Sequence, residues 1–200
     1  MRIKSQWFKD GKPKTATQSA SVIAFIAWRL AQNAVKQMRG AQFDIDPGPQ
    51  YFAFVSEFLI FLIQIADRIA YARLEATYRA DFTTALVIRV AEILEENEDT
   101  LLGTPAGQSH KSQFIDLFNQ RSADYATMHY DKDGDGPDFA FLRYLGFRIT
   151  DFMIKKDQTW VIDQIMDIEA PQAVEDITRG MDGLFDSSPK PARRQRMSGD

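Results

Sequence analysis

Hydrophobic side chains cover nearly the whole circumference of one stretch of the chain, residues 51–74 (YFAFVSEFLIFLIQIADRIAYARL). A surface helix shows a wide polar face, and this stretch does not. A membrane span needs about 18 apolar residues with few charges, and Glu57, Asp67 and Arg68 interrupt the run. We therefore predict a buried core helix and no membrane span. From Tyr51 to Ile65 its polar side chains are those of Tyr51, Ser56, Glu57 and Gln64.

The polar positions of this stretch follow helical spacing, with steps of seven, four, three and four residues. One explanation is that the stripe faces solvent or is satisfied by neighbouring helices, since buried polar groups are normally paired. The other is that Glu57 lies in an apolar setting with a functional partner, which would raise its pKa. Arg143 or Arg148 is the expected partner, because a buried carboxylate needs a cation. The stripe consists of Glu57, Gln64, Arg68, Tyr71 and Glu75, and the predicted polar core of Glu57, Gln64, Asp67, Arg68, Arg143 and Arg148.

Helical periodicity continues on both sides of the central stretch. The first helix is expected to start near Thr17 or Ser19 and to end at Gly40, followed by a Pro- and Gly-containing linker. The central helix then begins around Pro49 or Gln50. Residues 50–98 contain no Gly or Pro and form either one long helix or two. We favour a break between residues 77 and 81, with Asp81 capping the second helix.

Further helices are expected at residues 112–129, 137–156, 160–171 and from 171 to 183 or 185. No stretch alternates long enough to build a sheet, so the fold class is all-α. We predict a bundle of about six helices around a central, nearly all-apolar long helix. The bundle domain spans residues 19–185, after an extended amino-terminal arm (1–18) and before a disordered basic tail (186–200).

Composition fits a single globular domain: 200 residues, 44% of them hydrophobic and 15 of them phenylalanine. Cysteine is absent, which excludes disulfides and thiolate chemistry. The net charge of −4 argues against general nucleic-acid binding.

The apolar run 20–28 faintly resembles a signal peptide, but Arg29 ends it and helical spacing continues. We therefore interpret it as a core helix of a cytoplasmic protein. The acidic run 92–99 is either a solvated helix end or a patch for a basic partner.

Candidate metal ligands are few. The chain has only two histidines, and the HExxH and Glu-x-x-His patterns are missing. The segment 131–142 begins like a calcium-binding loop but has Leu142 where the bidentate glutamate belongs. No cofactor can be named. The candidate ligands for a carboxylate or single-histidine site are Glu57, Asp67, Asp124 and His129, and those of the calcium-like loop are Asp131, Asp133 and Asp135.

Three functional hypotheses remain. In the first, the protein is a protein-interaction or regulatory module that forms a homodimer and binds another protein, because the apolar surface of residues 51–74 is typical of interfaces. In the second, the bundle is an enzyme or metal-binding protein with a buried carboxylate site around Glu57. In the third, exposed aromatic side chains attach the protein to a membrane surface, although no basic amphipathic face accompanies them.

Overall fold

The computed structural model describes residues 14–131, 134 and 136–185. Its helices are α1 (Ala16–Gly40), α2 (Pro49–Arg73), α3 (Ala76–Leu102), α4 (His110–Tyr125), α5 (Phe139–Thr150), α6 (Val161–Gln164) and α7 (Ala170–Phe185). A π-helical turn, η2 (Ile165–Glu169), joins α6 to α7, so the three form one helical run. A hairpin of two-residue strands, β1 (Tyr130–Asp131) and β2 (Gly136–Pro137), lies between α4 and α5. The predicted all-α bundle of about six helices is confirmed.

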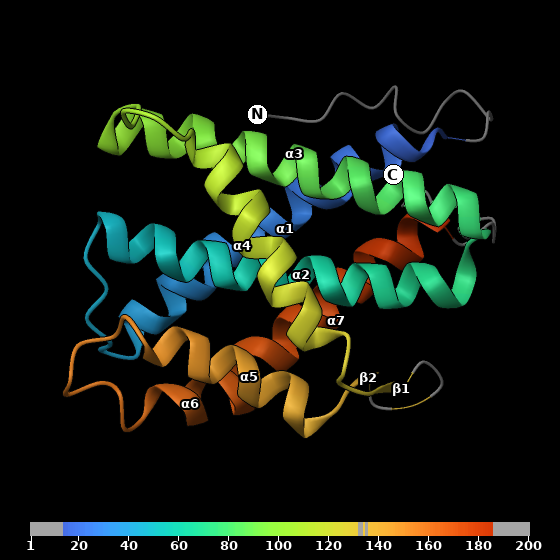
Figure 1. The fold of residues 1–200 in the computed structure, drawn as a ribbon. Helices are drawn as coiled ribbons and strands as arrows, with labels where there is room; N and C mark the ends of the chain where they lie inside the picture. The colour runs from blue at the N-terminus through green and yellow to red at the C-terminus, as the bar shows by residue number, and fades with distance from the viewer. Residues whose placement is uncertain (1–13, 132–133, 135, 186–200) are drawn as a thin grey trace, which may run out of the picture.

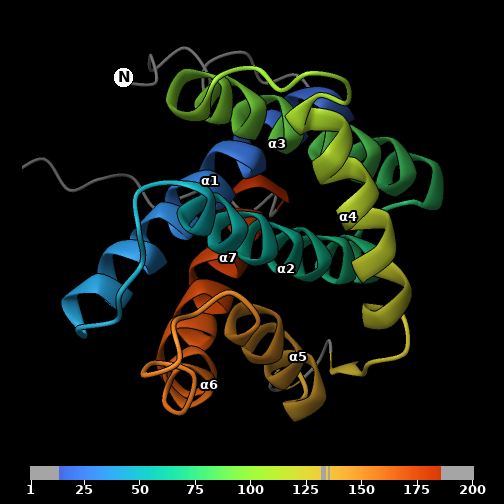
Figure 2. The same ribbon diagram turned by 60° about the vertical axis from the view of Figure 1, so that its left-hand side comes forward.

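The central apolar helix is α2, and the other helices surround it. It packs against α1, α3, α4, α5 and α7, which lie on different sides of it in the two views of Figures 1 and 2. The side chains of Phe54, Phe58 and Phe61 are completely buried. Their rings follow one another at centroid distances of 5.7 and 6.0 Å, and Phe61 meets Phe141 of α5 at 5.8 Å. Because the chain covers α2 with its own helices, the apolar surface that suggested a dimer interface is not exposed.

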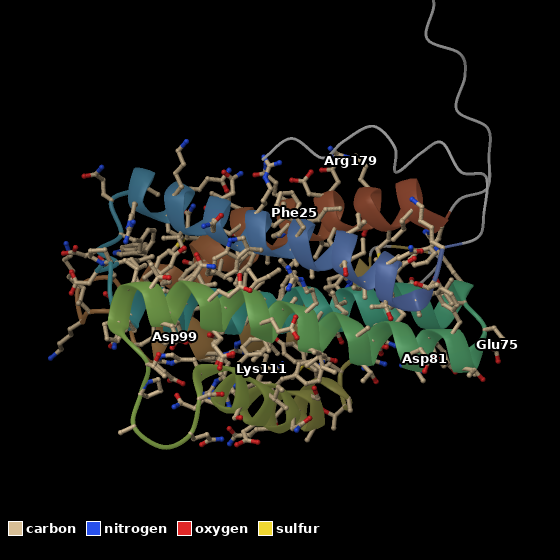
Figure 3. All side chains as sticks on the ribbon, turned by 90° about the horizontal axis from the view of Figure 1, so that it is seen from above. Phe25, Glu75, Asp81, Asp99, Lys111 and Arg179 are labelled. Carbon is tan, nitrogen blue, oxygen red and sulfur yellow. The ribbon has the colours of Figure 1, made fainter. Side chains whose placement is uncertain are left out.

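The long helical stretch is divided in two, as favoured, but the break lies earlier than predicted. It falls at Leu74 and Glu75, where the Glu75 carboxylate accepts hydrogen bonds from the backbone N–H groups of Thr77 and Tyr78. The predicted segment 77–81 and its cap Asp81 are wrong, because Asp81 lies inside α3. Figure 3 shows Glu75 at the end of α3 and Asp81 farther along it. After this turn α3 runs back alongside α2 (Figure 1).

At the amino end, α1 starts at Ala16, slightly before the expected start. The Thr15 side chain accepts from the backbone N–H of Gln18, and the Gln18 side chain accepts from that of Thr15. This capping box satisfies two N–H groups that have no partner within the helix. The helix ends at Gly40, as predicted. The rest of the predicted arm, residues 1–13, lies outside the described residues, as does the predicted tail at 186–200.

The carboxyl-terminal helices differ from the prediction in two places. Helix α5 ends at Thr150 instead of residue 156. The predicted interruption at Pro171 is also wrong, since α6, η2 and α7 are continuous through it. The π-helical turn explains this: the N–H of Ala170 bonds to the carbonyl of Ile165, five residues back. Proline has no backbone N–H to donate, and the turn immediately before it is the one with the wider hydrogen-bonding pattern.

Candidate functional site

A polar seam joins α2 to α4 through three side chains of the predicted stripe. Gln64 donates to the hydroxyl of Ser122 at 2.7 Å, and Arg68 donates to the backbone carbonyl of Tyr125 at 3.0 Å. Glu57 is bound by Arg121. The stripe is therefore satisfied by a neighbouring helix, the first of the two explanations that the spacing allowed. Its last two members lie outside the seam, since Glu75 caps α3 and Tyr71 is 70% exposed.

The ion pair between Glu57 and Arg121 is the most enclosed in the described part of the chain, with side chains 7% and 12% exposed. The Nε atom of Arg121 lies 2.9 and 3.2 Å from the two carboxylate oxygens, and Nη2 lies 2.7 Å from one of them. Burial lowers the pKa of Arg121, but the hydrogen bonds and charge of Glu57 outweigh this and raise it overall. Both oxygens of the Glu57 side chain therefore contact the Arg121 guanidinium.

The expected partners of Glu57 lie elsewhere, so that prediction is wrong. Arg143 lies over the rings of Phe139 and Phe147, at 5.8 and 4.9 Å from their centroids. Arg148 pairs with Asp151 at 2.8 Å. Arg121 could not be singled out from the sequence, because most residues of α4 are polar and only two of them are buried. Its arginine therefore looks like an ordinary surface residue.

Two tyrosines lie beside this ion pair. Tyr125 is completely buried, and its hydroxyl has no hydrogen-bond partner among the described residues. Burial, reinforced by the charge of Glu57, raises its pKa well above 10. The Tyr144 ring packs edge-on against Tyr125 at 4.9 Å, and its hydroxyl donates to Asp124. Burial and that hydrogen bond raise the pKa of Tyr144 to about 12. Both phenols therefore stay protonated at neutral pH and cannot serve as ready bases.

Asp67, the remaining acid of the predicted polar core, turns away from the seam toward α3. Arg79 binds it in a two-point contact, with Nε 3.0 Å from one oxygen and Nη2 2.5 Å from the other. The Thr83 hydroxyl donates to the same carboxylate at 2.6 Å. Hydrogen bonding to Asp67 raises the pKa of Arg79. This network borders a groove of about 400 Å³ between α2, α3 and α4.

The predicted metal ligands do not assemble into a site. Asp124 is engaged by Tyr144, and His129 and Asp131 are exposed around the start of the β-hairpin. Asp133 and Asp135 lie outside the described residues. Within the described ranges, no group of three or more His, Asp or Glu side chains is placed to hold a metal ion.

The acidic end of α3 meets basic groups supplied by the chain itself. Lys111 of α4 pairs with Glu92 at 3.2 Å, and its backbone N–H donates to Glu95. His110 lies 3.4 Å from Glu98, whose pKa is raised by burial. Figure 3 shows Lys111 beside α3. The run is thus neither fully solvated nor dependent on another protein for its cations.

Several exposed hydrophobic side chains lie on α5, just before α6 and on η2. Phe139 and Trp160 are each 66% exposed, and Phe147 is 42% exposed with Arg143 lying between it and Phe139. Helix α6 lies beside α5, because the position where Gly146 would carry a Cβ is 3.3 Å from Ile162. We call this surface the α5–α6 face; it consists of Phe139, Arg143, Phe147, Trp160, Asp163, Asp167 and Ile168.

Comparison of the chain with protein-family models, with curated proteins and with solved structures finds no match. None of the helices in the described residues combines the length and the apolar character that crossing a membrane requires.

Proposed function

We propose that the protein is a self-associating protein-interaction module, a homodimer formed through the α5–α6 face. The observation that carries this proposal is the exposed ladder Phe139–Arg143–Phe147 on α5, with Trp160 exposed just before the neighbouring α6. Aromatic residues and arginine are the side chains enriched at the centres of protein interfaces. A helix that only covered the core would present polar residues at these positions.

A second copy of the chain is the occupant that the charges favour. The face carries a cation, Arg143, on α5 and two exposed anions, Asp163 and Asp167, on the neighbouring helical run. A two-fold axis brings the α5 of one subunit against the α6 of the other, so that Arg143 of each subunit lies opposite Asp163 and Asp167 of the other. Self-association by this route leaves α2 fully inside each subunit. The dimer is therefore proposed on a different surface from the one that the sequence suggested.

The alternative of a catalytic or metal site around Glu57 has less support. A general base needs a free carboxylate oxygen within reach of a substrate, and both oxygens of Glu57 contact Arg121. An enclosed ion pair of this kind fixes how α4 sits on α2. Binding through an outer face thus agrees better with the chemistry of the described residues.

We also propose that the protein acts in the cytoplasm. The run 20–28, which resembled a signal peptide, is part of α1, and Ala20, Ala24, Ala27 and Trp28 are buried in the core. A fluorescent fusion at the carboxyl end that distributes through the cytoplasm would support this assignment, and export of the fusion would overturn it.

Sedimentation velocity over a concentration series tests the dimer. Phe147→Lys places a charge at the centre of the ladder and is expected to leave only monomer. The matched control is Ile88→Lys on α3, because Ile88 is exposed to nearly the same extent, 41% against 42%. A wild-type chain that stays monomeric at millimolar concentration contradicts the proposal. So does a Phe147→Lys variant that dimerises as well as the control.

A further inference from the structure

The groove between α2, α3 and α4 lies away from the α5–α6 face, and no role has yet been given to it. Helices α3 and α4 lie close together near the loop that joins them (Figures 1 and 2). Toward the start of α3 the two helices diverge, and the groove lies between them and α2. Gln64 and Asp67 of α2 line the groove, with Arg79 and Thr83 on the α3 side and Phe118 and Ser122 on the α4 side. Its volume of about 400 Å³ lies within the range of small-molecule sites.

Hydrogen bonds fix the orientation of the Gln64 amide. The Ser122 hydroxyl donates its proton to the carbonyl of Phe118 at 2.7 Å, so the same oxygen must accept from Gln64. The amide nitrogen of Gln64 therefore points at Ser122, and the amide oxygen points away from Ser122. That oxygen accepts no hydrogen bond from any described residue, although Gln64 is only 9% exposed. Gln64 lines the groove, so an acceptor that is open to solvent and that no described residue occupies borders it.

Arg79 supplies a donor at the wall. Its Nε and Nη2 atoms bind Asp67, while Nη1 makes no hydrogen bond to the described residues. The contact with Asp67 and the Tyr71 ring, whose centroid lies 4.8 Å from the guanidinium carbon, hold the guanidinium in place. A fixed donor and a fixed acceptor therefore border one groove, and the ring of Phe118 lines the opposite side.

We infer that the groove binds a small neutral molecule that carries a carboxamide group on an apolar body. A carboxamide carries an N–H donor and a C=O acceptor, which are the counterparts of the Gln64 oxygen and of Arg79 Nη1. The two charged residues of the lining, Asp67 and Arg79, neutralise each other. An anionic ligand would compete with Asp67 for Arg79, and a cationic ligand would compete with Arg79 for Asp67. The site therefore selects against charge.

Titrations of the full chain with three probes of the same shape test this inference: benzamide, the benzoate anion and the benzamidinium cation. Nuclear magnetic resonance follows the backbone amides of Thr83 and Ser122 and the side-chain amide of Gln64. Benzamide is expected to shift these signals with a millimolar dissociation constant, and the charged probes to bind at least about tenfold more weakly.

Two exposed alanines provide the matched variants. Ala80 lines the groove, so Ala80→Leu is expected to fill it and abolish the benzamide shifts without disturbing the core. Ala123→Leu, an exposed position of α4 that does not line the groove, should leave them unchanged. Equal binding of the three probes, no shift with benzamide, or unchanged benzamide binding in Ala80→Leu would each overturn the inference. None of these outcomes depends on whether the chain dimerises.

Discussion

Removing Arg121 tests how strongly the enclosed ion pair ties α4 to α2. Arg121→Met keeps the length and apolar volume of the side chain but leaves the Glu57 carboxylate buried without a cation. Breaking a buried pair in this way costs about 3–5 kcal/mol of unfolding free energy. In a domain of this size each kcal/mol corresponds to about 2–4 °C, so the melting temperature should fall by about 6–20 °C.

Urea and thermal unfolding of three variants separate this cost from a general effect of arginine loss. In the double variant Arg121→Met, Glu57→Leu no unpaired charge remains, and stability should return to within about 1–2 kcal/mol of wild type. Arg179→Met is the exposed control, since Arg179 and its partner Glu175 are 65% and 73% exposed. It should cost no more than about 0.5 kcal/mol. A loss below about 1 kcal/mol for Arg121→Met would show that the ion pair contributes little to holding α4 on α2.

Two further predictions concern single groups. Thr15→Ala removes the capping box of α1 and should cost about 1 kcal/mol in urea unfolding; a change as small as that of the exposed neighbour Thr17→Ala would contradict it. Glu169 is 2% exposed, one of its oxygens has no partner in the described region, and burial raises its pKa above 4.5. The folded state therefore favours the protonated acid, a stabilising contribution that is present below about pH 4.5 and is lost as the pH rises through the raised value. Relative to Glu169→Gln, the wild type should lose stability as the pH rises from about 4 to about 7, measured by urea unfolding. A difference that does not vary with pH would contradict the assignment.

The fold class could be predicted from the sequence because the hydrophobic pattern indicates which residues are buried. A helix that is apolar on all sides has to be surrounded, and α2 is. The polar stripe on α2 could also be predicted, since the side chains of Glu57, Gln64 and Arg68 share a helix face. Element ends were less predictable. Glu75 replaced Asp81 as a cap because a glutamate can also reach the first free N–H groups of a helix, although it is a less usual choice.

Partners across the bundle could not be predicted. The distance along the chain from Glu57 to Arg121 is 64 residues, and no periodicity within a helix reports which helix lies opposite. Arg143 and Arg148 stood in an apolar setting and looked better placed, yet Arg143 lies against Phe139 and Phe147 on the outer face. The same limit applies to the proposed interface. The amount of apolar surface on residues 51–74 suggested self-association, but only the packing of the chain shows that this surface is covered.

Hydrogen exchange at two protein concentrations, one below and one above the dissociation constant of the proposed dimer, shows whether each chain covers its own α2. We expect the backbone amides of α2 to be equally protected at both concentrations, because each chain covers its own α2, and protection along α5 and α6 to increase as the proposed dimer forms. Faster exchange of α2 on dilution, with α5 unchanged, would instead show that a second chain covers the phenylalanines.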